Sequence, residues 1–287
     1  MRQTPPAIFD HNRLRLRRNR SATRFSDSDF LHERTISDIV DRLETVTRDF
    51  DLALFIGAGD IADMLTPACG VNNIITMDTS TKRMPSNGAN LVAQEEFLPI
   101  AASSVDLIVS TLTLHNANDL IGALAQMRLA LKPDGLLIAA LFAESTLSNL
   151  KSAVYAAEAA HRGAIASRFS PMSTIQDLGS ALTRAGFALT SVDIDRANVT
   201  YREPTRLIDD LRAIGDTNIL TGKIIPLTKT IRNDALQRFT DNGGHEHFDI
   251  AFLTGWAPHP EQPKPRKPGS ATASLRDAIG NIPTEEK

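Results

Sequence analysis

The stretch Leu52–Asp78 constrains the fold more than any other part of this chain. A short apolar run ends in the turn Gly57-Ala58-Gly59, and a helical pattern separates the turn from a second apolar run that ends on Asp78. Strand, glycine turn, helix, strand and acid form the opening of a doubly wound α/β fold. The glycines allow a ligand close to the backbone, the helix would point its N–H groups at that ligand, and the acid is placed to bind a ribose. A two-glycine turn between a strand and a helix is also common for purely structural reasons, so the turn alone does not show that a ligand binds.

The composition excludes several classes of protein. The chain has 287 residues, 42% of them hydrophobic, and a net charge of -3, which favours neither DNA nor an anionic membrane. Its single cysteine, Cys69, allows no intrachain disulfide and fits a reducing compartment. There is no secretory signal and no apolar run near the roughly 20 residues that span a bilayer. These observations predict a cytoplasmic protein without a transmembrane segment.

After Asp78 the alternation of strands and helices continues. The pattern predicts a helix over Asp119–Leu131 and a turn, Lys132-Pro133-Asp134-Gly135, in which glycine takes a positive φ. Five strands joined by crossovers imply a parallel sheet, and the last two strands could pair as an antiparallel edge. The strands predicted after Asp78 are Leu91-Val92-Ala93, Val105–Thr111, Leu136–Phe142, Leu189–Ile194 and His247–Ala257.

Three further regions flank or interrupt this pattern. Residues 1–47 comprise an arginine-rich arm and an amphipathic helix at Phe30–Val46; the arm is either solvated or docks to an acidic partner or phosphate. Residues 48–257 form the main domain. Within it, residues 201–244 carry helical patterns that predict a lid over the carboxyl ends of the strands, or else a packing elaboration. Residues 258–287 are a proline-rich tail expected to be disordered.

Several of these segments resemble the class I S-adenosylmethionine-dependent methyltransferases. The glycine turn resembles the first motif of that superfamily, and Asp78 its ribose-binding acid. Residues 94–100 and 104–107 resemble its adenine-side segment and fourth strand, and 129–136 its turn before the fifth strand. The resemblance implies a Rossmann-like α/β fold with a seven-stranded, mostly parallel sheet of order 3-2-1-4-5-7-6 and a helical insert between strands six and seven. It also implies S-adenosyl-L-methionine as the cofactor.

A narrower resemblance covers nearly the whole chain. The segments at 9–10, 30–31, 41–43, 110–115 and 118–120, with further matches toward 255–256, are similar to the methyltransferase-fold assembly factors of respiratory complex I and their alphaproteobacterial relatives. Hydroxylation of an arginine has been proposed for that family instead of methyl transfer. The family is related to the carrier-protein methyltransferases of biotin synthesis. This resemblance implies a protein or carrier-protein acceptor, with a complex I subunit as one candidate.

The resemblance places a set of site residues along the chain. It implies that the cofactor contacts the turn Gly57-Ala58-Gly59 and the ends of the next strands, and that His115 and Asn116 face the acceptor. His115 could instead cap or pack a helix. No metal site is predicted, because His245 and His247 flank Glu246 without a third ligand. Besides the turn, the implied cofactor contacts are Asp78 and Thr79 for the ribose, Gln94 and Glu95 for the adenine, and Ser110 and Thr111 for the methionine moiety.

The chain also departs from the superfamily pattern. Phe55 stands where an acid is usual, the turn lacks a third glycine, and Gln94 replaces an aspartate. A missing charge-assisted hydrogen bond costs about 1.5–3 kcal/mol. Two hypotheses follow: a methyltransferase-family enzyme acting on a protein or carrier-protein acceptor, in the bacterial cytoplasm or the mitochondrial matrix of a eukaryote, or a non-catalytic assembly module that keeps the fold. A nucleic-acid methyltransferase is disfavoured, because no Asn/Asp-Pro-Pro-aromatic signature follows the fourth strand.

Overall fold

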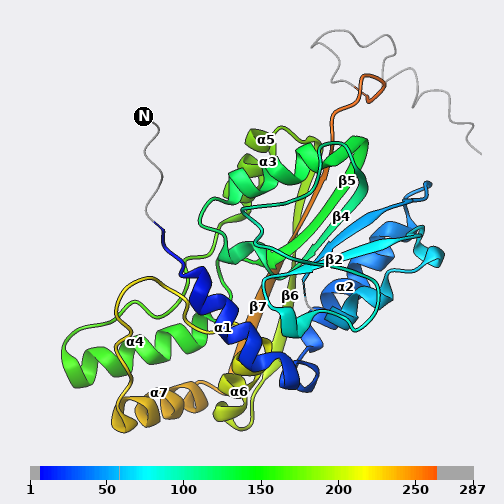
Figure 1. Cartoon of the computed structure of the whole chain (residues 1–287). Coiled ribbons are helices and arrows are strands. Elements are labelled where there is room, and N and C mark those ends of the chain that lie inside the picture. Colours follow the sequence, from blue (N-terminus) through cyan, green and yellow to red (C-terminus); the bar gives the residue numbers. More distant parts are fainter. Residues whose placement is uncertain (1–6, 58, 264–287) are drawn as a thin grey trace, which may run out of the picture.

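The computed structural model describes residues 7–57 and 59–263, and it contains one seven-stranded sheet in the order β3-β2-β1-β4-β5-β7-β6 (Figure 1). The first five strands run parallel, and β7 pairs antiparallel with both β5 and β6. The predicted strand order and the antiparallel edge are therefore confirmed. The strands are β1 Ala53–Ile56, β2 Ile74–Asp78, β3 Ala89–Val92, β4 Val105–Thr111, β5 Leu131–Phe142, β6 Ala188–Thr200 and β7 His245–Trp256.

The central strands are buried on both faces, as their unbroken apolar sequence predicts. Every residue of β1 and β4 is buried. Alternate residues of β1 face opposite layers: Phe55 joins the core cluster that includes helix α2, Phe30–Glu44, and Leu54 joins the cluster that includes α3, Leu120–Ala130. Helix α5, Ile175–Ala185, packs beside α3. The sheet thus lies between two helical layers.

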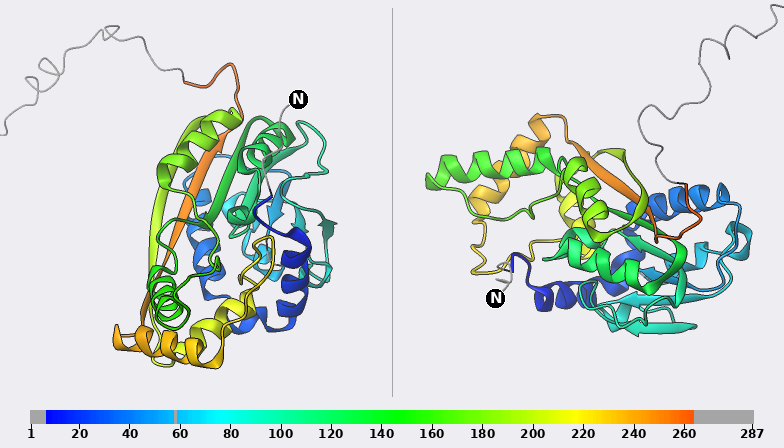
Figure 2. Two further views of the ribbon diagram at one scale, coloured as in Figure 1. Left: turned by 90° about the vertical axis from the view of Figure 1, so that its left-hand side faces the viewer. Right: turned by 90° about the horizontal axis from the view of Figure 1, so that it is seen from above.

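Three helices gather beyond one end of the sheet. They are α4 Ser148–Arg162, α6 Pro204–Ile214 and α7 Lys229–Asp241. In both views of Figure 2, α4 (green) and α7 (orange) lie against each other, and the two helices are in contact. The segment between β6 and β7 supplies α6 and α7. Glu246 joins this layer to the sheet, because its buried carboxylate accepts hydrogen bonds from the backbone N–H groups of Asn149 and Leu150 at the start of α4.

The connection between β1 and β2 differs from the prediction. The described residues form two short 3-10 helices, η2 Gly59–Met64 and η3 Pro67–Cys69, where the sequence pattern predicts an α-helix. Pro67 has no N–H to continue a helix. The apolar side chains that produced the helical pattern are buried against α2 instead. The prediction of an α-helix directly after the glycine turn is therefore wrong, and the 3-10 helix η2 begins there instead.

The turn before β5 also differs in one detail. Asp134 adopts the positive φ of 63°, and Gly135 does not. The glycine is needed for space, because a Cβ there would lie 2.8 Å from the Lys132 carbonyl oxygen. The structure extends β5 back to Leu131, with a register shift opposite β4.

The structure describes most of the N-terminal region but only the start of the C-terminal tail. Arginine-rich residues form helix α1, His11–Ser21, which lies beside α6 and the segment that follows β2 (Figure 1). Most of the proline-rich tail, from residue 264 on, falls outside the described residues. Among the described residues no helix is long and apolar enough to cross a membrane.

Candidate functional site

The carboxyl ends of β1, β2 and β4 lie side by side, and the predicted site residues follow them. Ile56 at the end of β1 is opposite Met77 on β2 and Ser110 on β4. Gly57 and Asp78 therefore stand at neighbouring strand ends, where ligands bind in open α/β sheets. Ala58, the middle residue of the predicted glycine turn, falls outside the described residues.

Asp78 is buried, with 2% of its surface exposed, and its two carboxylate oxygens differ. Oδ1 accepts hydrogen bonds from the Ser80 N–H at 2.6 Å and from the Thr79 hydroxyl at 3.4 Å. Oδ2 has no hydrogen-bond partner among the described residues. Buried polar atoms are nearly always paired, so an unpaired carboxylate oxygen is notable. It leaves one acceptor at the end of β2 that a hydroxyl of a ligand could use.

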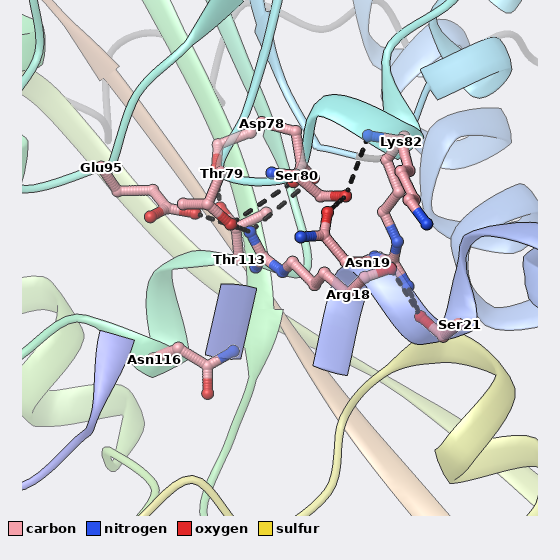
Figure 3. Close-up of polar contacts among 12 residues, drawn as sticks. Arg18, Asn19, Ser21, Asp78, Thr79, Ser80, Lys82, Glu95, Thr113 and Asn116 are labelled. Carbon is pink, nitrogen blue, oxygen red and sulfur yellow. Dashed lines mark hydrogen bonds and ion pairs between the residues drawn. The ribbon is translucent and has the colours of Figure 1, made fainter. Parts of the chain in front are cut away.

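Arg18 of α1 supplies the positive charge beside this acid. Its Nη1 lies 3.7 Å from Asp78 Oδ2, 3.2 Å from Thr79 Oγ1 and 3.4 Å from Glu95 Oε1, contacts drawn in Figure 3. Burial works to lower the pKa of Arg18, but the carboxylates of Asp78 and Glu95 outweigh it and raise this pKa. Arg18 is 4% exposed. The interpretation of the arginine-rich arm as a solvated segment is therefore wrong for Arg18, whereas Arg15 and Arg20 of the same helix are exposed.

The two described glycines of the turn are explained by contacts within the protein. Gly57 has a φ of 152°, and a Cβ there would lie 2.2 Å from Thr111 Oγ1. A Cβ on Gly59 would lie 2.5 Å from the Arg83 carbonyl oxygen. Phe55, which replaces the usual acid, is fully buried in the core, and its Cε1 would lie 3.5 Å from a Cβ on Gly57. The turn is therefore tightly packed against its own chain.

Residues after β3 and β4 complete the set of predicted contacts. Glu95 is buried against Arg18, whereas Gln94 is half-buried and makes a bridge to Phe97 without a side-chain hydrogen bond. The Ser110 and Thr113 hydroxyls are 3.0 Å apart. The Thr111 hydroxyl is buried and has no hydrogen-bond partner in the part of the chain described. Asp78, Thr79 and Glu95 thus converge on Arg18, and Ser110 and Thr111 lie at the end of β4, on the other side of β1.

His115 and Asn116 lie in η5, Leu114–Asn116, and meet a residue that the sequence did not single out. Asp216 Oδ1 is 3.4 Å from His115 Nε2 and 3.4 Å from Asn116 Nδ2. His115 Nε2 and Asn116 Nδ2 are 3.0 Å apart. Burial works to raise the pKa of Asp216, but His115 and Arg18 lower it to about 2. Asp216 follows Gly215, which ends α6. The insert therefore delivers a carboxylate to the end of β4.

The arrangement has a definite chemical capacity. An adenosyl group requires an acceptor for its ribose and polar groups near its amino-acid end, and the unpaired oxygens of Asp78 and Thr111 meet those requirements. His115 could hold or release a proton, with Asp216 fixing the orientation of its ring. Among the described residues no cluster of His, Cys, Asp and Glu has the form of a metal site. The residues fit an adenosyl cofactor, although Arg18 occupies the space beside Asp78.

The chain is similar in sequence and in fold to several known proteins. A family described as a methyltransferase domain matches residues 52–139. The chain is 32% identical to the arginine hydroxylase NDUFAF5 of zebrafish (Danio rerio), over 97% of this chain and 92% of that protein. It is 34% identical to the malonyl-[acyl-carrier protein] O-methyltransferase of Xylella fastidiosa, over 66% of this chain and 63% of that protein. The crystal structure of YcgJ from Bacillus subtilis shares the fold, with a TM-score of 0.55 at 15% identity, covering 79% of this chain and all of that one.

Proposed function

The chain belongs to the family of the arginine hydroxylase NDUFAF5, and from this premise we propose that it is an S-adenosylmethionine-dependent enzyme of the methyltransferase class that acts on a protein or carrier-protein acceptor. The observation that carries the proposal is a pair of buried oxygens that have no hydrogen-bond partner among the described residues: Asp78 Oδ2 at the carboxyl end of β2 and Thr111 Oγ1 at that of β4, on either side of β1. A buried oxygen without a hydrogen bond is costly unless a ligand supplies one.

Each group has a proposed role. Asp78 and Thr79 would hold the ribose, Glu95 would lie beside the adenine, and Ser110 and Thr111 would border the methionine end. When bound, S-adenosylmethionine supplies an activated methyl group. The protein then needs mainly to align the acceptor and exclude water. His115 would take a proton from the acceptor, with Asp216 and Asn116 holding the imidazole.

The acceptor is proposed from the relatives. Those similar over nearly the whole chain are named arginine hydroxylases, and one similar over 66% of it is named a carrier-protein O-methyltransferase. A protein side chain or a carrier-bound carboxylate is therefore the acceptor class to test. Because the sequence resembles complex I assembly factors, a subunit of that complex is the first candidate.

Calorimetric titration with S-adenosylmethionine tests the binding step. We expect Asp78→Ala to weaken binding, because it removes a charge-assisted hydrogen bond to the ribose that contributes about 1.5–3 kcal/mol. Asp60→Ala is a matched control, because this exposed acid near the turn has no hydrogen bond or ion pair among the described residues. Absence of heat from the wild-type protein at millimolar ligand would contradict the proposal.

Intact mass spectrometry of candidate acceptors tests the reaction. A gain of one methyl group by the acceptor that depends on His115 and Asp216 supports methyl transfer. A gain of one oxygen would contradict methyl transfer and indicate hydroxylation. Asp216→Asn is expected to keep cofactor binding and slow the reaction.

A second function has its own support. A non-catalytic assembly module would explain why Arg18 neutralises Asp78 and why no α-helix is seen among the described residues between β1 and β2. This alternative predicts that Asp78→Ala leaves the cellular function intact and that a pull-down still recovers the same partner. Loss of function in that variant would count against it.

A further inference from the structure

Helix α1 covers the segment after β2 residue by residue. Arg18 contacts Asp78 and Thr79, as described above. The next residue, Asn19, accepts a hydrogen bond from the Ser80 hydroxyl at 2.6 Å. Ser21 accepts one from Arg83 Nη2 at 2.7 Å. Figure 3 shows the contacts of Arg18 and Asn19 with this segment. The part of the chain that would hold a ribose is therefore already bound to the protein's own N-terminal helix.

The attachment of α1 to the rest of the molecule is mainly polar. Phe9 and Leu14 bury their side chains with Ile219 in a small cluster, separate from the two clusters that line the sheet. Backbone hydrogen bonds tie the same segment to the insert: Asp10 N–H donates to the Ile219 carbonyl at 2.8 Å. Segments with few apolar contacts are the ones that open locally while the core stays folded. The segment Phe9–Ser21 has no member in either of the two apolar clusters that line the sheet, which is the condition that favours local opening.

We propose that Phe9–Ser21 is a strap that closes the nucleoside side of the cofactor site, and that the cofactor must displace Arg18 from Asp78 in order to bind. The proposal rests on the proposed function and describes the regulation of that same site. Arg18 and a ribose hydroxyl compete for the same carboxylate oxygen, since Asp78 Oδ2 lies 3.7 Å from Arg18 Nη1 and has no hydrogen bond among the described residues. The measured affinity then equals the affinity of the open form multiplied by the fraction of molecules in which the strap is open.

Two other roles for Arg18 give different results. If Arg18 itself binds the cofactor, its removal weakens binding. If it only pins α1 to the body, its removal lowers thermal stability and leaves the affinity unchanged. A strap that competes with the cofactor predicts tighter binding when the contact is broken.

Calorimetric titration with S-adenosylhomocysteine, which cannot react, distinguishes these roles in the full chain. We expect Arg18→Gln to bind about tenfold more tightly than the wild type, the change produced when a strap closed about ten times in eleven is released. Arg15→Gln is the matched control, because Arg15 is an exposed arginine of the same helix, and its affinity should equal that of the wild type.

A second variant covers the case in which Arg18→Gln does not fold. Leu14→Ala loosens the small apolar cluster without touching Asp78 or Glu95, and it too should bind more tightly than the wild type. Equal or weaker binding by a folded Arg18→Gln, or by Leu14→Ala if the first variant does not fold, would overturn the strap while leaving the proposed function standing. Absence of binding by every variant would refute the proposed function and the strap with it.

Discussion

His32 in α2 is a buried histidine that is held neutral. It is 3% exposed and packs edge-on against Phe25, with ring centroids 4.8 Å apart. Burial, together with the positive charge of Arg83, lowers its pKa from 6.5 to about 3. The unfolded chain therefore binds a proton near pH 6.5 that the folded chain does not. The stability that neutral His32 contributes is complete above about pH 6.5 and is lost as the pH falls toward 3.

This linkage gives a prediction for urea unfolding between pH 7 and pH 4. The wild-type free energy of unfolding should fall more steeply with decreasing pH than that of His32→Gln, by up to about 1.4 kcal/mol per pH unit. His161→Gln serves as the comparison, because His161 lies at the surface and pairs with Asp234. Parallel curves for the wild type and His32→Gln would show that His32 titrates normally in the folded protein.

Individual site residues differed in how far the sequence could predict them. Asp78 and Glu95 follow recognisable strand patterns, so their place at the carboxyl edge followed from topology. Arg18 and Asp216 could not be found this way, because each meets the site from an element 60 or more residues away in sequence. An arginine in a basic run and an acid after a helix-ending glycine carry no local signal of burial. Their pairing appears only when α1 and the insert are placed in three dimensions.

At the scale of elements, Glu158 of α4 holds the loop that follows its helix. Its carboxylate is fully buried and accepts hydrogen bonds from Arg168 Nη2 at 2.6 Å, Arg162 Nη1 at 3.2 Å and the Ala166 N–H at 3.1 Å. The hydrogen bond from Arg168 is the main reason that the pKa of Glu158 is lowered. Arg168 also donates to the Ile225 carbonyl oxygen, which links this loop to the segment before α7.

Replacing Glu158 should therefore loosen the helical layer beyond the sheet. We expect Glu158→Gln to lower the free energy of unfolding by roughly 2 kcal/mol, less than for a fully buried pair because both arginines are partly exposed. Guanidinium unfolding followed by circular dichroism measures this change. Asp209→Asn, which breaks an exposed pair with Arg212, should leave stability unchanged. Equal stability of the two variants would mean that Glu158 does not anchor the loop.

The elements that the sequence predicted correctly are those with strong apolar patterns. β4 matches its predicted bounds because all seven residues are buried, and α2 and α3 match within two residues because their apolar stripes face the core. The segment after Gly59 misled the prediction, since Ile61, Leu65 and Cys69 have helical spacing but Pro67 divides them. The spacing of apolar residues indicates which side chains are buried. A proline among them determines whether one continuous helix can carry them.

At the scale of the whole molecule, the candidate site lies where three parts of the chain meet. The sheet supplies Asp78 and Thr111, and η5 after β4 supplies His115. The N-terminal helix supplies Arg18, and the insert between β6 and β7 supplies Asp216. Strand order followed from the sequence because crossover rules leave few topologies. The closure of the site by α1 did not, because it depends on contacts between distant polar residues. The strands of the family fold therefore form one side of the candidate site. Helix α1 and the insert between β6 and β7 form the other side.

A crystal structure determined with S-adenosylhomocysteine would show directly how the ligand and Arg18 share this site. We expect electron density for the ribose against the carboxylate of Asp78, with the Arg18 guanidinium moved away from Oδ2. Density for the ligand elsewhere, or an Asp78–Arg18 contact that persists in crystals grown with saturating ligand, would contradict this expectation.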